Sequence, residues 1–179
     1  SPTSMNPIPI IIEFNKDVQN FEIGDLVVSN NAQVKDLRLS IDKRRWRAKI
    51  YPADNGVITV NLPAGKVQDM AGNDSAAADE LTFEYDSTNP AVVFSSTAPE
   101  EPLATNTRPI PFTITFNEPV NGFALNLLAI GNGTAVNLVE TPPGNRKVYT
   151  FGVNPSIEDG AVTVDMAAGL VVDDSGNGN

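Results

Sequence analysis

Apolar residues lie along the chain in short runs, and turn-forming residues separate these runs. In the first half the runs are residues 8–14, 26–29, 46–51, 56–62 and 81–85. They are rich in β-branched and aromatic side chains and are bounded by Asn, Gly, Asp and Pro, which is typical of strands. In the run WRAKIY the alternation points Trp46, Ala48 and Ile50 inward and their neighbours outward. Residues 76–82 or 124–130 could supply at most one turn of helix, and we interpret the second stretch as the start of a strand after an irregular corner.

The whole pattern occurs twice. NPIPIIIEFNKDVQNF from Asn6 matches RPIPFTITFNEPVNGF from Arg108, an offset of 102 residues. Later the offset grows to 104, where GVITVNLPAGKVQDMAGN from Gly56 matches GAVTVDMAAGLVVDDSGN from Gly160. A period near 100 residues is too long for a solenoid unit of about 20 to 50 residues. Each copy should therefore be a whole domain.

Short strands, frequent turns and about 100 residues per copy are typical of a two-sheet sandwich of the immunoglobulin type. We therefore predict an all-β fold of two tandem Ig-like β-sandwich domains, residues 1–86 and 87–179, joined by a short connector from Tyr85 to Val92. The connector contains Pro90 and no flexible Gly/Ser tract, so it should be semi-rigid. The matched inward positions predict two separate cores. They are Ile10, Ile12, Phe14, Trp46, Ile50, Ile58 and Val60 in the first copy and Phe112, Ile114, Phe116, Tyr149, Val153, Val162 and Val164 in the second.

The two copies differ at their ends. A strand-like segment, AVVFSS, precedes the second copy but not the first, whereas LTFEY follows the first copy but not the second. We therefore expect the first domain to lack its first strand and the second domain its last. An unpaired strand edge can template pairing with another chain. The strand expected around Ala161 to Val172 is thus a candidate for self-association.

Composition excludes several classes of function. The chain has 179 residues without cysteine or histidine, which removes thiolate chemistry and the commonest general base and metal ligand. We therefore expect no enzyme activity. The net charge of −10 disfavours nucleic-acid and anionic-membrane binding, and the lack of a run of about 20 apolar residues disfavours membrane insertion. We expect the sequence to be part of a longer protein.

Several motifs together carry a family resemblance. They are an N/R-P-I-P strand start, F-x-E-P-V, Y-x-F-x-V-x-P, G-x-V-T-V and A-G-x-x-x-D-x-x-G-N, and they cover nearly the whole chain. With these motifs the sequence resembles the bacterial Ig-like repeat domains found in tandem in large secreted and cell-surface proteins. The resemblance implies an extracellular or cell-surface location, neighbouring repeats as partners, and a spacer function in an adhesin-type stalk. The alternative is a module that binds carbohydrate or another ligand.

Two D-x-x-G-N motifs, at Asp69 and Asp173, supply oxygen atoms beside glycines, as calcium loops do. They are equally typical of turns in which Asn and Gly adopt positive φ and Asp caps its own backbone. In a seven-strand sandwich the second motif should lie near residues 117–118 and near the connector. Carboxylates at one joint repel unless a cation lies between them. We therefore predict a calcium site formed by Asp86, Asn117, Glu118, Asp173, Asp174 and Asn177. The first copy has Lys16 in place of Glu118.

The cluster KRRWR, residues 43–47, is the strongest basic feature of the acidic chain. One interpretation is an anionic glycan or nucleic-acid contact with Trp46 stacking on the ligand. The other is a solvated row of outward charges that protects a sheet edge, with Trp46 in the core. The match of Trp46 with Tyr149 favours the second interpretation.

Overall fold

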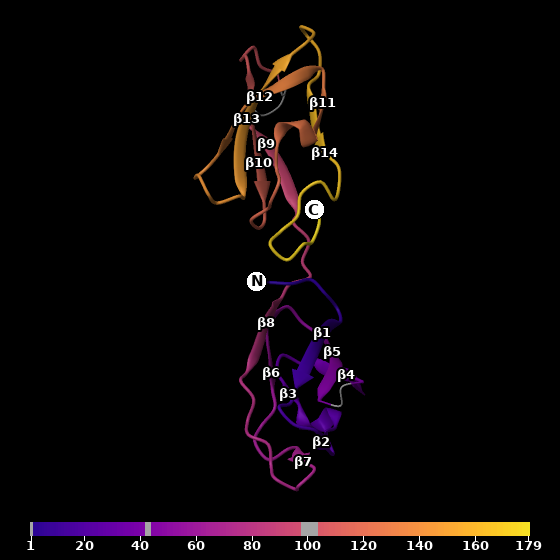
Figure 1. Cartoon of the computed structure of the whole chain (residues 1–179). Helices are drawn as coiled ribbons and strands as arrows, with labels where there is room; N and C mark the ends of the chain where they lie inside the picture. Colours follow the sequence, from indigo (N-terminus) through magenta and orange to yellow (C-terminus); the bar gives the residue numbers. More distant parts are fainter. Residues whose placement is uncertain (1, 42–43, 98–103) are drawn as a thin grey trace. The chain divides into compact units, whose positions relative to one another are not determined.

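The computed structural model describes residues 2–41, 44–97 and 104–179, and the chain divides into two compact units, Ser1–Ser87 and Thr88–Asn179. Figure 1 draws unit 1 from indigo to magenta and unit 2 from there to yellow. Each unit is described by itself.

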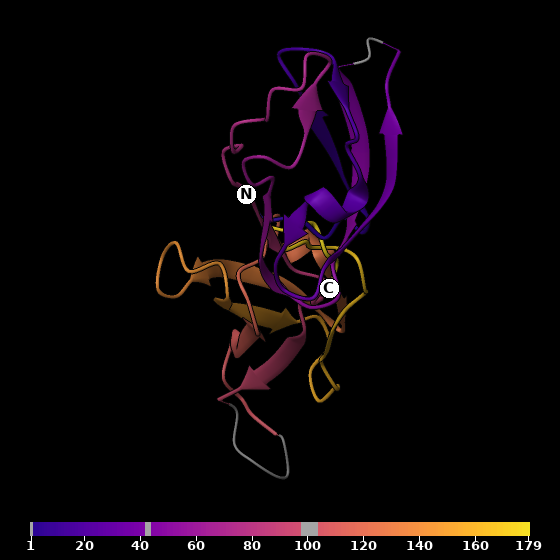
Figure 2. The ribbon, with the colours of Figure 1, turned by 90° about the horizontal axis from the view of Figure 1, so that it is seen from below.

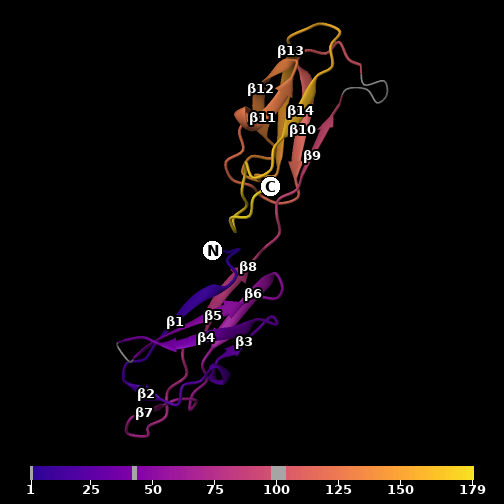
Figure 3. The ribbon, with the colours of Figure 1, turned by 90° about the vertical axis from the view of Figure 1, so that its right-hand side faces the viewer.

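Unit 1 contains two three-stranded antiparallel sheets in the orders β1-β5-β4 and β3-β6-β8, and a short pair β2-β7. The strands of the first sheet lie side by side in Figure 3. Their bounds are β1 Ile8–Glu13, β4 Gln33–Leu39 and β5 Arg45–Tyr51; β3 Val27–Val28, β6 Gly56–Asn61 and β8 Leu81–Tyr85; and β2 Val18–Gln19 and β7 Gln68–Asp69. A 3-10 turn, η1 Ile23–Asp25, precedes β3.

Unit 2 contains a four-stranded sheet in the order β12-β13-β10-β9 and a pair β11-β14, and Figure 2 shows both in a second view. The bounds are β9 Val92–Ser96, β10 Ile110–Phe116, β12 Gly133–Glu140 and β13 Val148–Pro155; and β11 Leu128–Gly131 and β14 Thr163–Met166. The stretch 124–130 forms the 3-10 turn η2 Leu125–Leu127 followed directly by β11, which confirms an irregular corner that leads into a strand.

The two units share one strand plan. The strand β1 corresponds to β10, β5 to β13, β4 to β12, β3 to β11 and β6 to β14, as the sequence offsets require. They differ in which flanking strand is present. Unit 2 has β9, which pairs with β10, whereas the matching strand β1 in the described part of unit 1 pairs only with β5. Unit 1 has β8, which pairs with β6, whereas the matching strand β14 in the described part of unit 2 pairs only with β11. The observed β14 is shorter than the strand expected between residues 161 and 172.

Each unit buries its own apolar cluster between its sheets. Both predicted inward sets are confirmed: every residue of the first set is buried in the cluster of unit 1 or packs against it, and every residue of the second has the same relation to the cluster of unit 2. Aromatic rings contribute to both clusters. Phe21 packs edge-to-face against Phe14 and Trp46, and Phe116 packs in the same way against Phe123 and Tyr149. The prediction of two separate cores is therefore confirmed.

Arg45, Trp46 and Arg47 of the basic cluster lie on β5, and one part of the interpretation of this cluster is wrong. Trp46 is partly buried and packs against the core, with its ring centroid 5.2 Å from that of Phe21, so its ring is directed inward and away from the outward arginines. However, β5 lies between β1 and β4 and is not an edge strand, so its outward arginines do not protect an edge. Lys43 lies outside the described residues.

Candidate metal centre

The D-x-x-G-N motifs form the same loop in both units. Asp69 Oδ1 accepts hydrogen bonds from the backbone N–H groups of Ala71 and Asn73, both at 2.9 Å. Asp173 Oδ1 accepts the equivalent bonds from Ser175 at 2.7 Å and Asn177 at 2.8 Å. Each aspartate therefore caps its own loop, as the turn interpretation predicts.

The glycines and asparagines of these loops have different functions. Gly72 and Gly176 adopt positive φ angles of 84° and 90°, which glycine tolerates without steric cost. Asn73 and Asn177, which follow these glycines, do not adopt positive φ angles, so this part of the turn prediction is wrong. Instead, each amide group donates to the loop aspartate: Asn73 Nδ2 to Asp69 Oδ2 at 3.0 Å, and Asn177 Nδ2 to Asp173 Oδ2 at 2.8 Å.

In unit 1 a lysine ammonium neutralises the loop aspartate. Lys16 Nζ lies 3.1 Å from Asp69 Oδ2, across 53 residues of sequence. The amide side chain and backbone N–H of Asn73, followed by the Lys16 ammonium, hold the pKa of the Asp69 carboxyl well below its usual range. In unit 1 the negative charge of the loop aspartate is therefore balanced by a lysine from elsewhere in the same unit.

In unit 2 a carboxylate stands at the position of that lysine. Glu118 matches Lys16, and carboxylate oxygens of Glu118 and Asp173 lie within 4.8 Å of each other. Asp173 is buried, with an exposed fraction of 4%, and Glu118 is half-buried. Such a set of oxygen donors can hold a metal ion but is not specific for calcium. Asp86, another acidic residue of the predicted set, belongs to unit 1 and is described below.

Two other predicted ligands are used in local hydrogen bonds. Asn117 Oδ1 accepts the backbone N–H of Ala91 at 2.7 Å, which ties the start of β9 to the end of β10. Asp86 Oδ1 accepts from Asn55 Nδ2 at 2.8 Å, and the backbone N–H of Asp86 donates to the carbonyl of Thr3 at 3.1 Å. Asn117 therefore belongs to unit 2, and Asp86 is anchored to unit 1.

Asp174 forms an ion pair in place of the predicted contact with the other acidic residues. Arg146 NH1 and NH2 each donate to one Asp174 oxygen at 2.7 Å, a bidentate geometry. Asn121 Nδ2 adds a third hydrogen bond at 2.9 Å. The Arg146 guanidinium, followed by the Asn121 amide, holds the pKa of the Asp174 carboxyl well below its usual range. The sequence contains no local signal for this pair, because 28 residues separate its members.

The sequence matches a family model in both halves. A model described as "Bacterial Ig-like domain" matches residues 4–85 and again residues 86–179. A solved structure described as "FdeC, a Novel Broadly Conserved Escherichia coli Adhesin Eliciting Protection against Urinary Tract Infections" is similar to this chain at 13% identity and a TM-score of 0.39. The similarity covers 93% of this chain and 60% of that chain, and at this level it carries no argument about function. The comparison with curated proteins gave no match. Within the residues that the structure describes, no helix has the length and apolar character needed to cross a membrane.

Proposed function

The chain belongs to the bacterial Ig-like domain family, with two copies in tandem, and we propose that it is a non-enzymatic spacer repeat of a bacterial cell-surface or secreted protein. Each copy has its own apolar core, so repeats of this kind can be added in series without changing one another's fold. In such an arrangement the number of repeats sets the reach of the protein. An adhesin-type stalk needs this property.

The connector supports a spacer, because it is anchored at both ends. On the side of unit 1, Ser87 donates from its backbone N–H and its hydroxyl to Asn55 Oδ1, at 3.0 and 2.8 Å. On the side of unit 2, Ala91 is bound to Asn117. Only residues 88–90 lie between these anchors, and three residues span at most about 11 Å. A tether this short, with Pro90 inside it, restricts how far the two repeats can separate and turn.

The resolved pKa shifts have structural causes. The pKa values of Asp69 and Asp174 are lowered by hydrogen bonds and ion pairs that close loops of the fold. Burial raises the pKa of the Tyr149 hydroxyl within the core of unit 2. These shifts arise from structural contacts, and none of them prepares a nucleophile or a general base for a substrate.

We further propose that calcium binds in the second copy and stiffens the joint. The comparison of Lys16 with Glu118 carries this proposal. In the first copy an ammonium group neutralises Asp69, whereas in the second copy the matching position adds a second carboxylate beside Asp173. Adjacent carboxylates repel unless one is protonated or a cation lies between them. A calcium ion bound to Glu118 and Asp173 would therefore do in the second copy what Lys16 does in the first.

Asp86 completes the proposed set from the connector. It precedes Ala91 by five residues, and Ala91 is bound to Asn117, the residue before Glu118. Five residues span at most about 18 Å, and the proposal requires the Asp86 carboxylate to reach Glu118 and Asp173 within that limit. Calcium bound by residues from the connector and from unit 2 would reduce the mobility of the connector.

Thermal melting in excess chelator and in millimolar calcium tests this proposal. Extracellular modules often bind calcium with a Kd of roughly 10⁻⁴ M, so about 1 mM calcium would stabilise unit 2 by about 1.4 kcal/mol. For a domain of this size that raises Tm by roughly 6 to 11 °C.

Two variants exchange the charges of the matched positions. In Glu118→Lys the new ammonium should replace the ion, so the Tm of unit 2 should no longer depend on calcium. In Lys16→Glu the first copy should gain a calcium dependence that it lacks in the parent chain. Identical melting of the parent chain in chelator and in calcium would show that the calcium proposal is wrong.

A further inference from the structure

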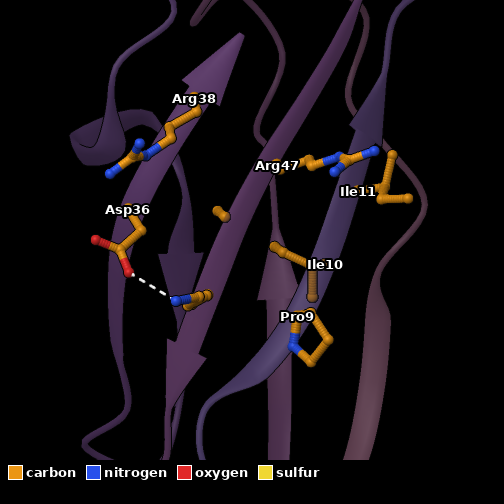
Figure 4. A pocket seen from close by; sticks show the side chains of 8 residues that line it. Pro9, Ile10, Ile11, Asp36, Arg38 and Arg47 are labelled. Atoms are coloured by element: carbon orange, nitrogen blue, oxygen red, sulfur yellow. Dashed lines mark ion pairs between the residues drawn. The ribbon is translucent and has the colours of Figure 1, made fainter. Parts of the chain in front are cut away.

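The outward face of the sheet β1-β5-β4 carries a group of lysine and arginine side chains. We call it the basic face. Each strand contributes two outward residues to it. They are Pro9 and Ile11 on β1, Arg47 and Lys49 on β5, and Lys35 and Arg38 on β4. An open hollow of ≈ 460 Å³ lies on this face, and Figure 4 shows the side chains that line it.

Two arginines on this face lie directly opposite each other. The register pairs Arg38 of β4 with Arg47 of β5, and the next partner in the same row is Ile11 of β1. A bulge between Lys35 and Arg38, with Asp36 at a positive φ of 58°, produces this pairing. Figure 4 shows the Arg47 side chain extending toward Ile11 and Arg38 on the other side of β5. Like charges directly opposite on neighbouring strands destabilise a sheet.

The neighbouring cations Arg45, Lys49 and Lys35 each have a partner, whereas Arg38 and Arg47 have none among the described residues. Arg45 Nε lies 3.0 Å from a Glu13 carboxylate oxygen, and Lys49 Nζ lies 3.2 Å from Asp36.

Lys35 Nζ lies 5.0 Å from the centre of the Tyr51 ring, a cation–π contact. Arg38 and Arg47 are both exposed, and among the described residues neither has an ion pair or a hydrogen bond from its side chain. The face therefore presents two guanidinium groups with unused donors.

The second copy shows that the fold does not need these charges. In unit 2 the equivalent row is Thr113, Thr150 and Val139, paired in the same order across β10, β13 and β12. The same three strands therefore form with uncharged residues at each of these positions. Packing and pairing do not explain why the first copy has two opposed arginines.

We propose that the basic face of the first copy binds a linear acidic polysaccharide, with Arg38 and Arg47 as the principal contacts. Guanidinium groups bind carboxylate and sulfate groups bidentately. Alternate residues of a strand lie about 6.8 Å apart, so β5 presents a line of evenly spaced cations that suits a chain with regularly repeated charges. The hollow is open along the face, and Pro9 and Ile11 offer apolar contacts for sugar rings.

Other anionic ligands fit this face less well. Single-stranded nucleic acids bind through aromatic side chains on which bases stack, but Trp46 is in the core and Tyr51 lies beneath Lys35. A second copy of this chain carries a net charge of −10, so long-range repulsion opposes such pairing. An acidic polysaccharide meets neither objection. This inference goes beyond the spacer function and does not depend on calcium.

Binding to immobilised heparin and polygalacturonate, with dextran as the neutral control, tests the inference. All measurements are made with the full chain in excess chelator, so that calcium cannot bridge the polysaccharide to acidic residues. Heparin presents mainly sulfates and polygalacturonate presents carboxylates, so the two probes distinguish the anionic group. We expect binding to at least one of them that weakens with added salt. In Arg38→Gln/Arg47→Gln the affinity should fall about 100-fold, about tenfold for each arginine.

The control variant Lys66→Gln/Arg108→Gln removes the same charge from other exposed positions and should bind as the parent chain does. The inference is wrong if the parent chain binds neither polyanion, or if the arginine variant loses less than about tenfold. It is also wrong if the control variant loses as much as the arginine variant, because binding would then reflect net charge alone. Single-stranded DNA that binds as tightly as the polysaccharides, or self-association that the arginine variant abolishes, would assign the face to another ligand.

Discussion

Replacing Phe116 by alanine should destabilise the second repeat and leave the first repeat unchanged. Phe116 is 1% exposed and ends β10 in the centre of the core of unit 2. Its ring packs edge-to-face on Phe123 and Tyr149, with centroid distances of 5.7 and 6.3 Å. Removing a buried ring forfeits its transfer free energy and leaves a cavity, which costs about 3 to 5 kcal/mol. For a domain of this size each kcal/mol lowers Tm by about 4 to 8 °C.

Differential scanning calorimetry of the full chain measures this effect. We expect the unfolding transition of unit 2 to fall by roughly 12 to 40 °C, or to disappear if the loss exceeds the stability of the domain, while the transition of unit 1 stays in place. Phe116→Leu is the matched control and should cost roughly 1 kcal/mol, because it keeps most of the apolar volume. If both transitions shift together in Phe116→Ala, the two cores are coupled and the reasoning from separate clusters is refuted.

Three further predictions concern charge and strand edges. Replacing Arg47 by threonine, the residue at the matched position of the second repeat, should stabilise unit 1 by about 0.2 to 1 kcal/mol because it removes the repulsion with Arg38. Denaturant unfolding at low and high salt measures this gain, and a loss of stability would contradict the prediction. The folded-state pKa of Asp174 lies below its unfolded value, so the stability contributed by its pair with Arg146 is present near neutral pH and is lost as the pH falls below about 4. Arg146→Gln should therefore reduce the fall in the Tm of unit 2 on acidification. If the variant has the same pH profile as the parent chain, this pair is not the source of that fall. β1 and β14 each pair on one side only among the described strands, so these edges should allow self-association once salt screens the repulsion between the acidic chains. Sedimentation velocity at high salt would show it as a sedimentation coefficient that rises with concentration, and a constant value would contradict it.

Much of the fold could be predicted because the two repeats constrain each other. The match of Trp46 with Tyr149 assigns both residues to the core, and the structure places both there. The alternation in WRAKIY likewise predicts which residues of β5 are buried. These are local patterns of period two, and a buried sheet face enforces them along the whole strand.

Features that depend on register or on distant loops could not be predicted. The bulge at Asp36 determines which residue of β4 lies opposite Arg47, and no local pattern indicates that it is Arg38. The sequence shows Lys16 at the position of Glu118, but not that its ammonium reaches Asp69 on a loop 53 residues away. Both contacts form only when separate strands are packed together.

The distance between the two repeats tests the spacer function most directly. The chain has no native cysteine, so cysteines introduced at Gln33 and Thr134, two exposed strand positions, can carry nitroxide labels for pulsed electron–electron distance measurements. We predict a narrow distribution of distances in millimolar calcium and a broader one in excess chelator. A distribution that is equally narrow in both would contradict a role of calcium at the joint, and one that is broad in both would contradict the proposal that these repeats act as a spacer.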